Sequence, residues 1–515
     1  MFRVADRNLI LSLMLLLLAA CGGSDSSSNN VALRTIGVTP ASPSQQLGKT
    51  LQLVATGTYS DGTTRDVSST ATWMSSKTSV AAISAAGLVS TVSIGAVTIT
   101  ATLDGVAGQA IMTVTPGPAI ESTLYTFGTA APILEDPNSP LLQASDGDFY
   151  GTTATGGANG NGTVYKITAA GIETVLYSFG ASPADATNPY GSLIQATDGN
   201  FYGTTSEGGA QRYCGIGLCG AVYKITPAGV ETVLHSFTEA LYGASPSQAY
   251  GPRGGLIQAS DGNFYGTAGG GANPCNSGVG RLVGCGSVYM ITPAGVETVI
   301  YSFGASASDG ISPVGALIQA SDGNFYGTTS EGGANGFGTV FKVTPAGIET
   351  VLHSFGASPS DGRNLFPPPF ESLIQASDGN FYGMTPGGGA NGAGTVYMIT
   401  PAGVETVIYS FGASASDGIA PAGALIQASD GNFYGMTASG GANTCPAGSP
   451  LTNSCGTVFE ITPAGVETIL YSFGASASDG SNPEGNLVQA SDGNFYGVTE
   501  GGGSQKSGTV FKLIP

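Results

Sequence analysis

The stretch Asp198-Gly199-Asn200-Phe201-Tyr202-Gly203 decides the fold of this chain, because it recurs almost unchanged along most of the sequence. Only the first of seven copies differs, with an aspartate in place of the asparagine. Self-similarity at a period of about 50 to 60 residues is typical of solenoids, propellers and arrays, so the repeat is interpreted first. The copies begin at Asp146, Asp198, Asp261, Asp322, Asp378, Asp430 and Asp492.

Each copy lies among short runs that are rich in β-branched and aromatic residues. An apolar run such as Leu193–Ala196 precedes the motif, and two further runs follow it, as in 162–168 and 173–179. Glycine, proline, aspartate or asparagine bounds every run, which is typical of strands. Asp-Gly between two runs indicates a hairpin turn, because glycine accepts positive φ. Each repeat therefore predicts four antiparallel strands, named a, b, c and d in chain order.

Seven sets of four short strands predict a closed seven-bladed β-propeller. The ends of the repeat region favour closure: it opens with a lone d strand, 122–127, and ends with a c strand, 509–513. We expect the first strand to complete the last blade, which would cover an edge prone to aggregation. An open solenoid of seven units is the alternative.

The N-terminus has the pattern of an export signal. Arg3 and Arg7 precede the apolar run 9–20, and Cys21 follows. The sequence 18–21, Leu-Ala-Ala-Cys, resembles the lipobox of bacterial lipoproteins. The resemblance implies a signal peptide over 1–20, lipidation of Cys21 and anchoring in a lipid bilayer, with the outer membrane as the expected location. A plain signal peptide or an N-terminal membrane helix is the alternative. Residues 21–33 are expected to form a flexible, lipidated tether.

Residues 34–116 differ from the repeats and show alternating strand-like runs around the only tryptophan, Trp73. About seven short strands over this length are typical of a sandwich. The motifs at 57–63, 79–81, 87–89 and 95–101 resemble a bacterial immunoglobulin-like domain of group 2. The resemblance implies an Ig-like β-sandwich acting as a spacer or adhesion module. We expect Trp73 to lie in the core between the sheets.

Residues 119–515 resemble the choice-of-anchor GloVer tandem repeats through their Gly-rich, Tyr-Gly-Thr-Thr and Leu-Tyr-Ser-Phe motifs. The resemblance implies an exported, anchored protein. It implies no catalytic residues.

Composition restricts the partners. The net charge is −19, and only 15 residues are lysine or arginine, without a basic stripe, which argues against nucleic acid. No motif indicates a cofactor, and we expect a monomer. The repeated Asp-Gly-Asn could be interpreted as a calcium loop, but it lacks the ligand spacing of an EF-hand, and a hairpin turn is favoured.

Six cysteines remain after Cys21, and they fall in three local pairs between strands b and c. In an exported protein such pairs indicate disulfides. The two histidines, His235 and His353, occupy a position of strand d that is tyrosine elsewhere, so we interpret them as structural and predict no metal site. The pairs are Cys214 with Cys219, Cys275 with Cys285, and Cys445 with Cys455.

Loop lengths locate the candidate binding surface. The a–b spacing is always 8 and the c–d spacing always 12, whereas the b–c spacing varies from 11 to 21 and the d–a spacing from 14 to 19. Because antiparallel strands alternate in direction, the two variable connections emerge on one side, and binding residues concentrate in such loops. Neutral insertions are the alternative. The aromatic and arginine residues of these loops are the ligand-binding candidates: Arg212, Tyr213, Tyr242, Tyr250, Arg253, Arg281, Arg363, Phe366 and Phe370.

These features predict a non-enzymatic recognition or adhesion lipoprotein that binds a glycan or a protein. A propeller hydrolase or lyase acting on polysaccharide and a purely structural envelope protein are the alternatives. The carboxylates of the b–c loops recur at matching positions, which fits structure or symmetric binding better than one catalytic pair.

Overall fold

The computed structural model describes residues 31–92, 95–115, 119–128, 134–135, 137, 139–210, 219–238, 249–252, 254–276, 282–363, 373–445 and 455–515. These residues form strands and turns and contain no helix, so none that could span a bilayer occurs among them. The chain divides into two compact units, one ending at Gly117 and one beginning at Pro118.

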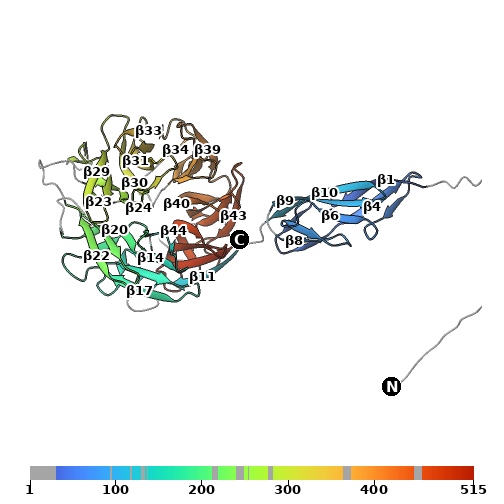
Figure 1. The fold of residues 1–515 in the computed structure, drawn as a ribbon, viewed down its shortest axis with the longest axis horizontal. Helices are drawn as coiled ribbons and strands as arrows, with labels where there is room; N and C mark the ends of the chain where they lie inside the picture. The colour runs from blue at the N-terminus through green and yellow to red at the C-terminus, as the bar shows by residue number, and fades with distance from the viewer. Residues whose placement is uncertain are drawn as a thin grey trace, which may run out of the picture. The chain divides into compact units, whose positions relative to one another are not determined.

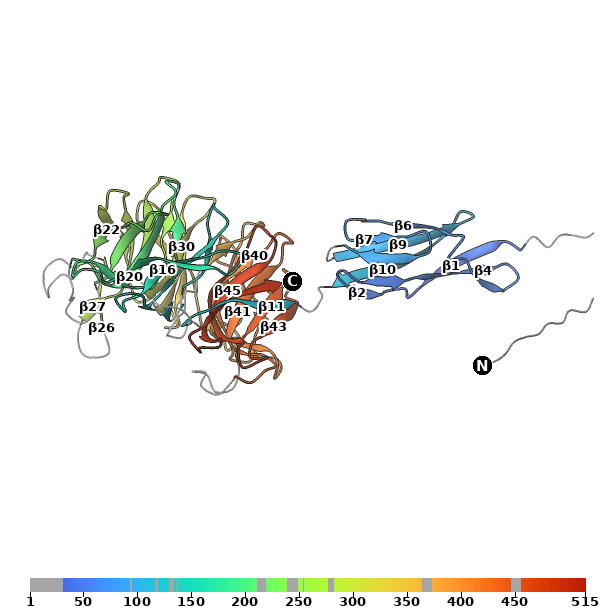
Figure 2. The same ribbon diagram turned by 90° about the horizontal axis from the view of Figure 1, so that it is seen from below.

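The first unit is a β-structure of three sheets (Figure 2). The largest has the order β2-β10-β9-β6, and the others have the orders β1-β4-β5 and β3-β8-β7. Burial alternates along the two longest strands, as the alternating sequence predicts. The strands are β1 (Leu33–Thr39), β2 (Ser44–Gln46), β3 (Thr50–Gln52), β4 (Val54–Tyr59), β5 (Thr64–Asp66), β6 (Thr72–Ser75), β7 (Ala81–Ile83), β8 (Leu88–Thr91), β9 (Gly95–Leu103) and β10 (Val106–Thr115).

Trp73 lies at the margin of this unit's core and is only partly buried. Its ring packs against the buried cluster that includes Val89 and Ala101. Its Nε1 donates a hydrogen bond to the carbonyl oxygen of Ser68, at 2.8 Å. Trp73 therefore contributes to packing as expected, but it does not fill the centre, because its polar nitrogen needs a backbone acceptor near the surface.

The second unit consists of seven sheets arranged around a common centre (Figure 1), each with the predicted order a, b, c, d. The a strands are β13 (Leu142–Gln143), β19 (Ile194–Gln195), β24 (Ile257–Gln258), β30 (Gly310–Gln319), β35 (Ile374–Gln375), β40 (Gly418–Gln427) and β44 (Gly480–Gln489). The b strands are β14 (Phe149–Thr153), β20 (Phe201–Gly208), β25 (Phe264–Gly270), β31 (Phe325–Gly332), β36 (Phe381–Thr385), β41 (Phe433–Gly440) and β45 (Phe495–Gly502).

The outer two strands of each sheet are equally regular. The c strands are β16 (Thr163–Ile167), β21 (Ala221–Ile225), β28 (Ser287–Ile291), β32 (Thr339–Val343), β38 (Thr395–Ile399), β42 (Thr457–Ile461) and β46 (Thr509–Ile514). The d strands are β11 (Ile120–Thr126), β17 (Glu173–Ser178), β22 (Glu231–Ser236), β29 (Glu297–Ser302), β33 (Glu349–Ser354), β39 (Glu405–Ser410) and β43 (Glu467–Ser472).

The a strand differs from its prediction. In three repeats it begins well before the Leu-Ile-Gln-Ala run, as in β30, whose first residues pair with the far end of β31. In other repeats a separate short strand takes this place. Much of the d–a connection is therefore strand, not loop. The short additional strands are β12 (Leu134–Glu135), β15 (Thr155–Gly156), β18 (Ala186–Pro189), β23 (Ala249–Pro252), β26 (Pro274–Asn276), β27 (Leu282–Gly284), β34 (Gly362–Arg363) and β37 (Gly387–Gly388).

The recurring motif forms the a–b hairpin, and its residues satisfy one another. Asp198 accepts hydrogen bonds from the backbone N–H of Asn200 at 3.0 Å and from its side-chain amide at 2.7 Å. Tyr202 donates its hydroxyl proton to the same carboxylate at 2.8 Å. Gly199 between them has φ of 79°, which a side chain would disfavour. Hydrogen-bond donors thus reach both carboxylate oxygens, which supports the hairpin interpretation of Asp-Gly-Asn.

Two sets of contacts join consecutive sheets. The Tyr of each b strand packs against the Phe of the next one, with centroids 4.2 Å apart for Tyr150 and Phe201. The Gln of each a strand accepts a hydrogen bond from the backbone of the preceding sheet's hairpin, as Gln195 does from Ser145 at 2.8 Å. Both sets return from the seventh sheet to the first: Tyr496 packs against Phe149, and Ser491 donates to Gln143.

The strand before the first complete repeat pairs with the last strand of the chain, as predicted. Thr123 of β11 lies opposite Phe511 of β46, and the pairing continues from Ile120 to Thr126. Phe127, which follows β11, is fully buried in a cluster with Leu141 and Val510. The N-terminal strand of this unit is therefore held by both backbone and core contacts with its C-terminal end.

Candidate functional site

The two variable connections of each repeat lie next to each other. In the first repeat, the backbone N–H of Ala158 in the b–c loop donates to the hydroxyl of Ser178, at the end of strand d. The side chain of Asn159 donates to the carbonyl oxygens of Ser178 and Phe179 at 3.2 and 3.1 Å. Asn335 and Asn391 make the same contacts in later repeats. Insertions in either loop therefore enlarge one continuous surface, called here the variable side.

Two of the three predicted disulfides are confirmed, and both close inserted b–c loops on this side. Cys275 is bonded to Cys285, and Cys445 to Cys455, each pair with Cα atoms 5.1 Å apart. Cys219 is also disulfide-bonded, whereas Cys214 lies outside the described residues. Closing these short loops limits their freedom and stabilises the surface that they form.

Tyr250 lies where the longest d–a insertion meets an inserted b–c loop. It belongs to β23, and its hydroxyl accepts a hydrogen bond of 3.3 Å from the backbone N–H of Gly284 in β27. Strand β27 pairs with β26 in the hairpin that the Cys275–Cys285 disulfide closes. The two insertions therefore support each other, and Tyr250 has a structural contact besides any binding role.

Arg363 is the other candidate whose surroundings are defined. It ends the short strand β34, and its guanidinium carbon lies 4.6 Å from the ring centre of Phe337, in the b–c loop of the preceding repeat. The Nε of Arg363 is buried without a hydrogen-bond partner. Stacking on the ring holds the cation in place. Phe337 was not predicted as a site residue, because its loop has the common length. Its only signal in the sequence is that Phe stands where the other loops of this length have Asn161, Ala393 and Ser507.

The remaining predicted site residues lie outside the described residues. They are Cys21, Arg212, Tyr213, Cys214, Tyr242, Arg253, Arg281, Phe366 and Phe370.

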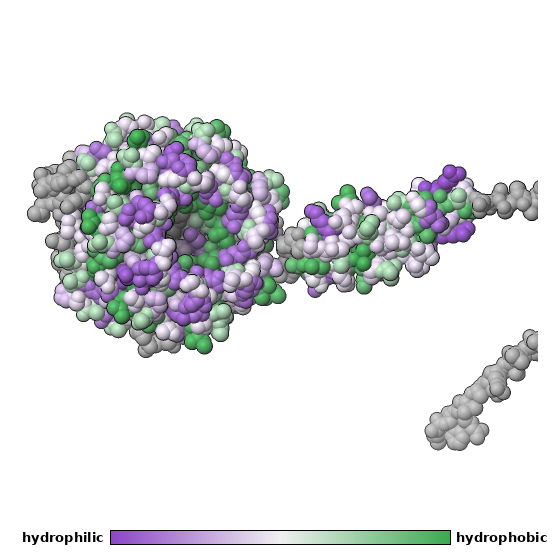
Figure 3. Space-filling model, in the orientation of Figure 1, coloured by the Kyte–Doolittle hydropathy of each residue, from purple (hydrophilic) through white to green (hydrophobic). Residues whose placement is uncertain are grey.

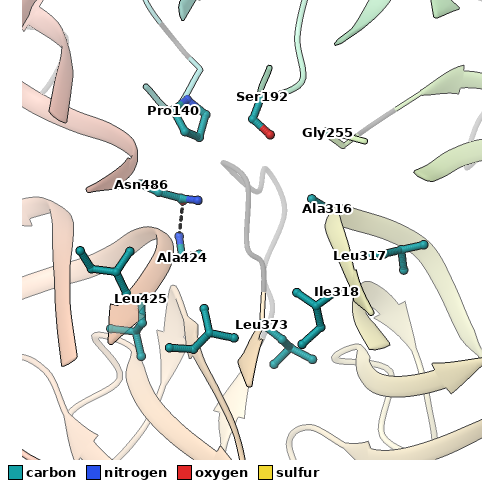
Figure 4. Close-up of a pocket in the computed structure, with 12 residues that line it drawn as sticks. Pro140, Ser192, Gly255, Ala316, Leu317, Ile318, Leu373, Ala424, Leu425 and Asn486 are labelled. Carbon is teal, nitrogen blue, oxygen red and sulfur yellow. Dashed lines mark hydrogen bonds between the residues drawn. The ribbon is translucent and has the colours of Figure 1, made fainter. Parts of the chain in front are cut away.

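A cavity of about 230 Å³ lies at the centre of the seven sheets (Figures 3 and 4). Its wall consists mostly of small or aliphatic residues in or next to the a strands, such as Ala316 and Leu425. Ser192 and Asn486 are the polar side chains among its described lining residues, and the Oδ1 of Asn486 accepts a hydrogen bond from the backbone N–H of Ala424 (Figure 4). None of these described lining residues is titratable.

The d strands lie at the outer edge of the seven sheets (Figure 1), and titratable side chains come together there between one d strand and the next. We call each such place a rim junction. It is formed by the Tyr or His near the end of one d strand, the Asp eight residues later where the sequence has one, and the first Glu of the next d strand. In one junction the hydroxyl of Tyr177 donates to Asp185 at 2.9 Å, and Glu231 lies close enough to raise the pKa of the tyrosine further. Burial is the largest single cause of that rise.

The junction glutamates have perturbed acidity. Burial and the negative charge of Asp185 raise the pKa of Glu231 to about 7. Burial and the negative charge of Asp309 raise the pKa of Glu349 to about 7. Glu121 of β11 behaves in the same way beside Asp479, so the N-terminal strand completes a junction of the usual kind. This repetition is typical of structural groups, since no single glutamate stands apart as a catalytic acid would.

The chain is thus an all-β repeat protein that carries an Ig-like unit. It belongs to the Gloeobacter/Verrucomicrobia repeat family, whose model matches residues 85–282 and 279–511. The model of the bacterial Ig-like domain (group 2) matches residues 32–114. The first repeat match begins within the Ig-like unit, although the strands of the repeat architecture begin at Ile120.

Three similar proteins match this chain either over a short segment or at low sequence identity. Ice-binding protein 1 of Shewanella frigidimarina is 56% identical over 43 residues, which is 8% of this chain and 5% of that protein. A protein of unknown function from Dyadobacter fermentans matches with a TM-score of 0.37 and 12% identity, covering 63% of this chain and 93% of that one. Puromycin hydrolase matches with a TM-score of 0.40 and 13% identity, covering 78% of this chain and 54% of that one. Likeness at these levels identifies no activity.

Proposed function

We propose that residues 119–515 form a closed seven-bladed propeller. The pairing of β11 with β46 supports closure, since it joins the two ends of the repeat region. The aromatic contact of Tyr496 with Phe149 and the hydrogen bond from Ser491 to Gln143 support it independently, because each is the seventh member of a series that runs through all repeats. Closure covers the edge of β46 that would otherwise be open and leaves only the short edges typical of propeller blades.

On this scaffold we infer a non-enzymatic recognition or adhesion function, with a glycan or a protein as the ligand. The observation that carries the proposal is the confinement of length variation to the variable side. The stacked pair of Arg363 and Phe337 adds to it: an oriented guanidinium beside an aromatic ring suits a sugar face, a carboxylate or an aromatic side chain. The described lining residues of the central cavity are mostly small or aliphatic, with Ser192 and Asn486 as their polar side chains, and such a wall suits a bound ligand.

The protein would act at the cell envelope. Lipidation of Cys21 would anchor the chain in the outer membrane, and the tether and Ig-like unit would separate the propeller from the bilayer. Changing Cys21 to Ser should move the protein from the membrane fraction to the soluble fraction. An unchanged membrane fraction would contradict the anchor.

The binding proposal is tested with a glycan array and an array of envelope and matrix proteins, beside a turnover assay on the same polysaccharides. We expect saturable binding without product, and Arg363→Ala should weaken it at least tenfold. Arg65→Ala is the matched control, because Arg65 also lies 4.6 Å from an aromatic ring, that of Tyr59, but belongs to the Ig-like unit. Product formation would favour a hydrolase or lyase, and equal losses in both variants would contradict a site on the variable side.

A further inference from the structure

One rim junction brings together a histidine and two carboxylates. His353 of β33, Asp361 eight residues later and Glu405 of β39 each offer a ligand atom, and these atoms lie within 4.8 Å of one another. Among the described residues this is the only group of three such side chains at that spacing. The group joins residues of β33 and β39, the outermost strands of two consecutive sheets (Figure 1).

The distances at this junction differ from those at the tyrosine junctions. There the phenol donates to the aspartate at 2.8 Å, as in Tyr301 with Asp309, or at 3.0 Å, as in Tyr409 with Asp417. The Nε2 of His353 lies 3.3 and 3.4 Å from the two oxygens of Asp361, which is longer than an ordinary N–H···O hydrogen bond. Around a tetrahedral cation with bonds of about 2.0 to 2.2 Å, neighbouring ligand atoms stand roughly 3.3 to 3.6 Å apart.

Burial and charge also favour a cation here. The side chain of Asp361 is 5% exposed and that of His353 is 16% exposed. The Oε1 atom of Glu405 is buried and has no hydrogen-bond partner, as is the case for the glutamates of other junctions. The Oδ2 of Asp361 accepts a hydrogen bond from the backbone N–H of Ala357 at 2.9 Å, and the imidazole of His353 faces both carboxylates. Buried charges are normally paired or bound to metals, so a cation at this point would compensate the two carboxylates.

The second histidine provides a comparison within the same chain. The Nε2 of His235 lies 3.6 Å from Glu297, and its Nδ1 lies 3.3 Å from the carbonyl oxygen of Gly295. The other oxygen of Glu297 accepts a hydrogen bond from the backbone N–H of Ala249. Two side chains meet here among the described residues, and backbone groups already engage both of them.

We propose that His353, Asp361 and Glu405 bind one divalent transition-metal cation, with Zn²⁺ as the expected ion. Imidazole nitrogen and carboxylate oxygens are ligands that Zn²⁺ accepts, and water can complete four-coordination at the exposed side of the junction. The ion clips β33 to β39 and so fastens two neighbouring sheets at their outer edge. This inference is independent of the recognition function and holds whether or not the variable side binds a ligand.

The test is titration of the purified, EDTA-treated full chain with ZnCl₂ by isothermal calorimetry. We expect saturable binding of one equivalent and a rise in Tm that EDTA reverses. His353→Tyr installs the residue that Tyr301 and Tyr409 provide in other repeats, so it should fold normally and lose both effects. His235→Tyr is the matched control and should keep both.

Glu405→Gln distinguishes a three-ligand site from a His–Asp pair alone. It preserves the size of the side chain but removes the anionic oxygen, and we expect the Zn²⁺ affinity to fall at least tenfold. Absence of saturable binding to the unchanged protein would overturn the proposal, and so would equal binding by His353→Tyr. Equal binding by Glu405→Gln would overturn the assignment of the third ligand.

Discussion

At the scale of single residues, the recurring Asp-Gly-Asn-Phe-Tyr-Gly motif is explained by a local hydrogen-bond group and a packing contact. Burial opposes ionisation of Asp198, but hydrogen bonds from Asn200, Tyr202 and Lys224 outweigh it and lower the pKa of that carboxyl to about 2. The tyrosine ring then packs on the next sheet, with its centroid 4.2 Å from that of Phe264. One turn residue therefore orients the aromatic side chain that joins two sheets.

Replacing Asp198 with Ala should consequently destabilise the fold more than an exposed turn substitution does. The phenol of Tyr202 and the amide of Asn200 would lose their acceptor, at a cost of about 1 to 2 kcal/mol. Urea denaturation monitored by tyrosine fluorescence would measure the shift in midpoint. Asp198→Asn keeps one acceptor oxygen and should cost less. Equal midpoints for Asp198→Ala and the parent would contradict this role.

The motif in the first repeat shows how a substitution is accommodated. Asp148 stands where the other copies have asparagine, and Lys166 forms ion pairs with both Asp146 and Asp148. In the sixth copy, strand c has Glu460 at the position of that lysine, and it accepts a hydrogen bond of 2.6 Å from the side chain of Asn432. In both copies a strand c side chain thus contacts the third residue of the turn, Lys166 by an ion pair with Asp148 and Glu460 by a hydrogen bond from Asn432.

At the scale of elements, β11 has an importance beyond its length. Its backbone pairs with β46, Phe127 after it is fully buried, and its Glu121 completes a rim junction. Deletion of residues 119–128 should therefore expose the edge of β46 and cause cooperative destabilisation and aggregation.

Calorimetry and light scattering of the truncated protein would check this prediction. A synthetic peptide with the sequence 119–128 should restore part of the lost Tm, because it can pair with the exposed edge. A truncated protein that remains monomeric and melts like the parent would show that β11 does not stabilise the repeat unit.

The inserted b–c loops provide a second prediction at this scale. Peptide mapping without reduction should recover Cys214 linked to Cys219, in addition to the two disulfides whose geometry is described. Cys219 is disulfide-bonded, and Cys214 is the nearest cysteine in the sequence and belongs to the same b–c loop. Recovery of Cys219 linked to a cysteine of another repeat would show that this loop pairs differently.

At the scale of the whole molecule, the sequence allowed prediction of whatever repeats at a constant spacing. Strand order, the a–b hairpins and the pairing of the first strand with the last follow from recurring runs and a count of strands. Contacts between repeats could not be predicted in this way. Glu405 reaches His353 from the next d strand, and Phe337 reaches Arg363 from the preceding repeat, because the arrangement of sheets, and not sequence spacing, brings these residues together.

The rim junctions give the molecule a pH dependence that opposes the usual one. The pKa of Glu121, Glu231, Glu349 and Glu467 is raised to about 7, through burial first and then through a neighbouring aspartate, from an ordinary value of 4.5. The folded state therefore binds more protons than the unfolded state between these two values. Stability should be highest at weakly acidic pH and should fall as pH rises through 7. Asp198, with its lowered pKa, loses its contribution only below pH 4.

Thermal unfolding measured at pH 5 and pH 8 should accordingly give a higher Tm at pH 5, at constant ionic strength. Glu231→Gln isolates the cause, because glutamine resembles the protonated glutamate and carries no charge at either pH. The Tm of this variant should be higher than that of the parent at pH 8 and similar at pH 5, so its Tm should differ less between the two pH values.

Asp198→Asn is the control. The carboxylate that it removes has a pKa of about 2, far below both pH values, so the Tm difference between pH 5 and pH 8 should be as large as in the parent. A parent protein that melts at a higher temperature at pH 8, or a Glu231→Gln variant with an unchanged difference, would show that the junction glutamates are ionised in the folded state at neutral pH.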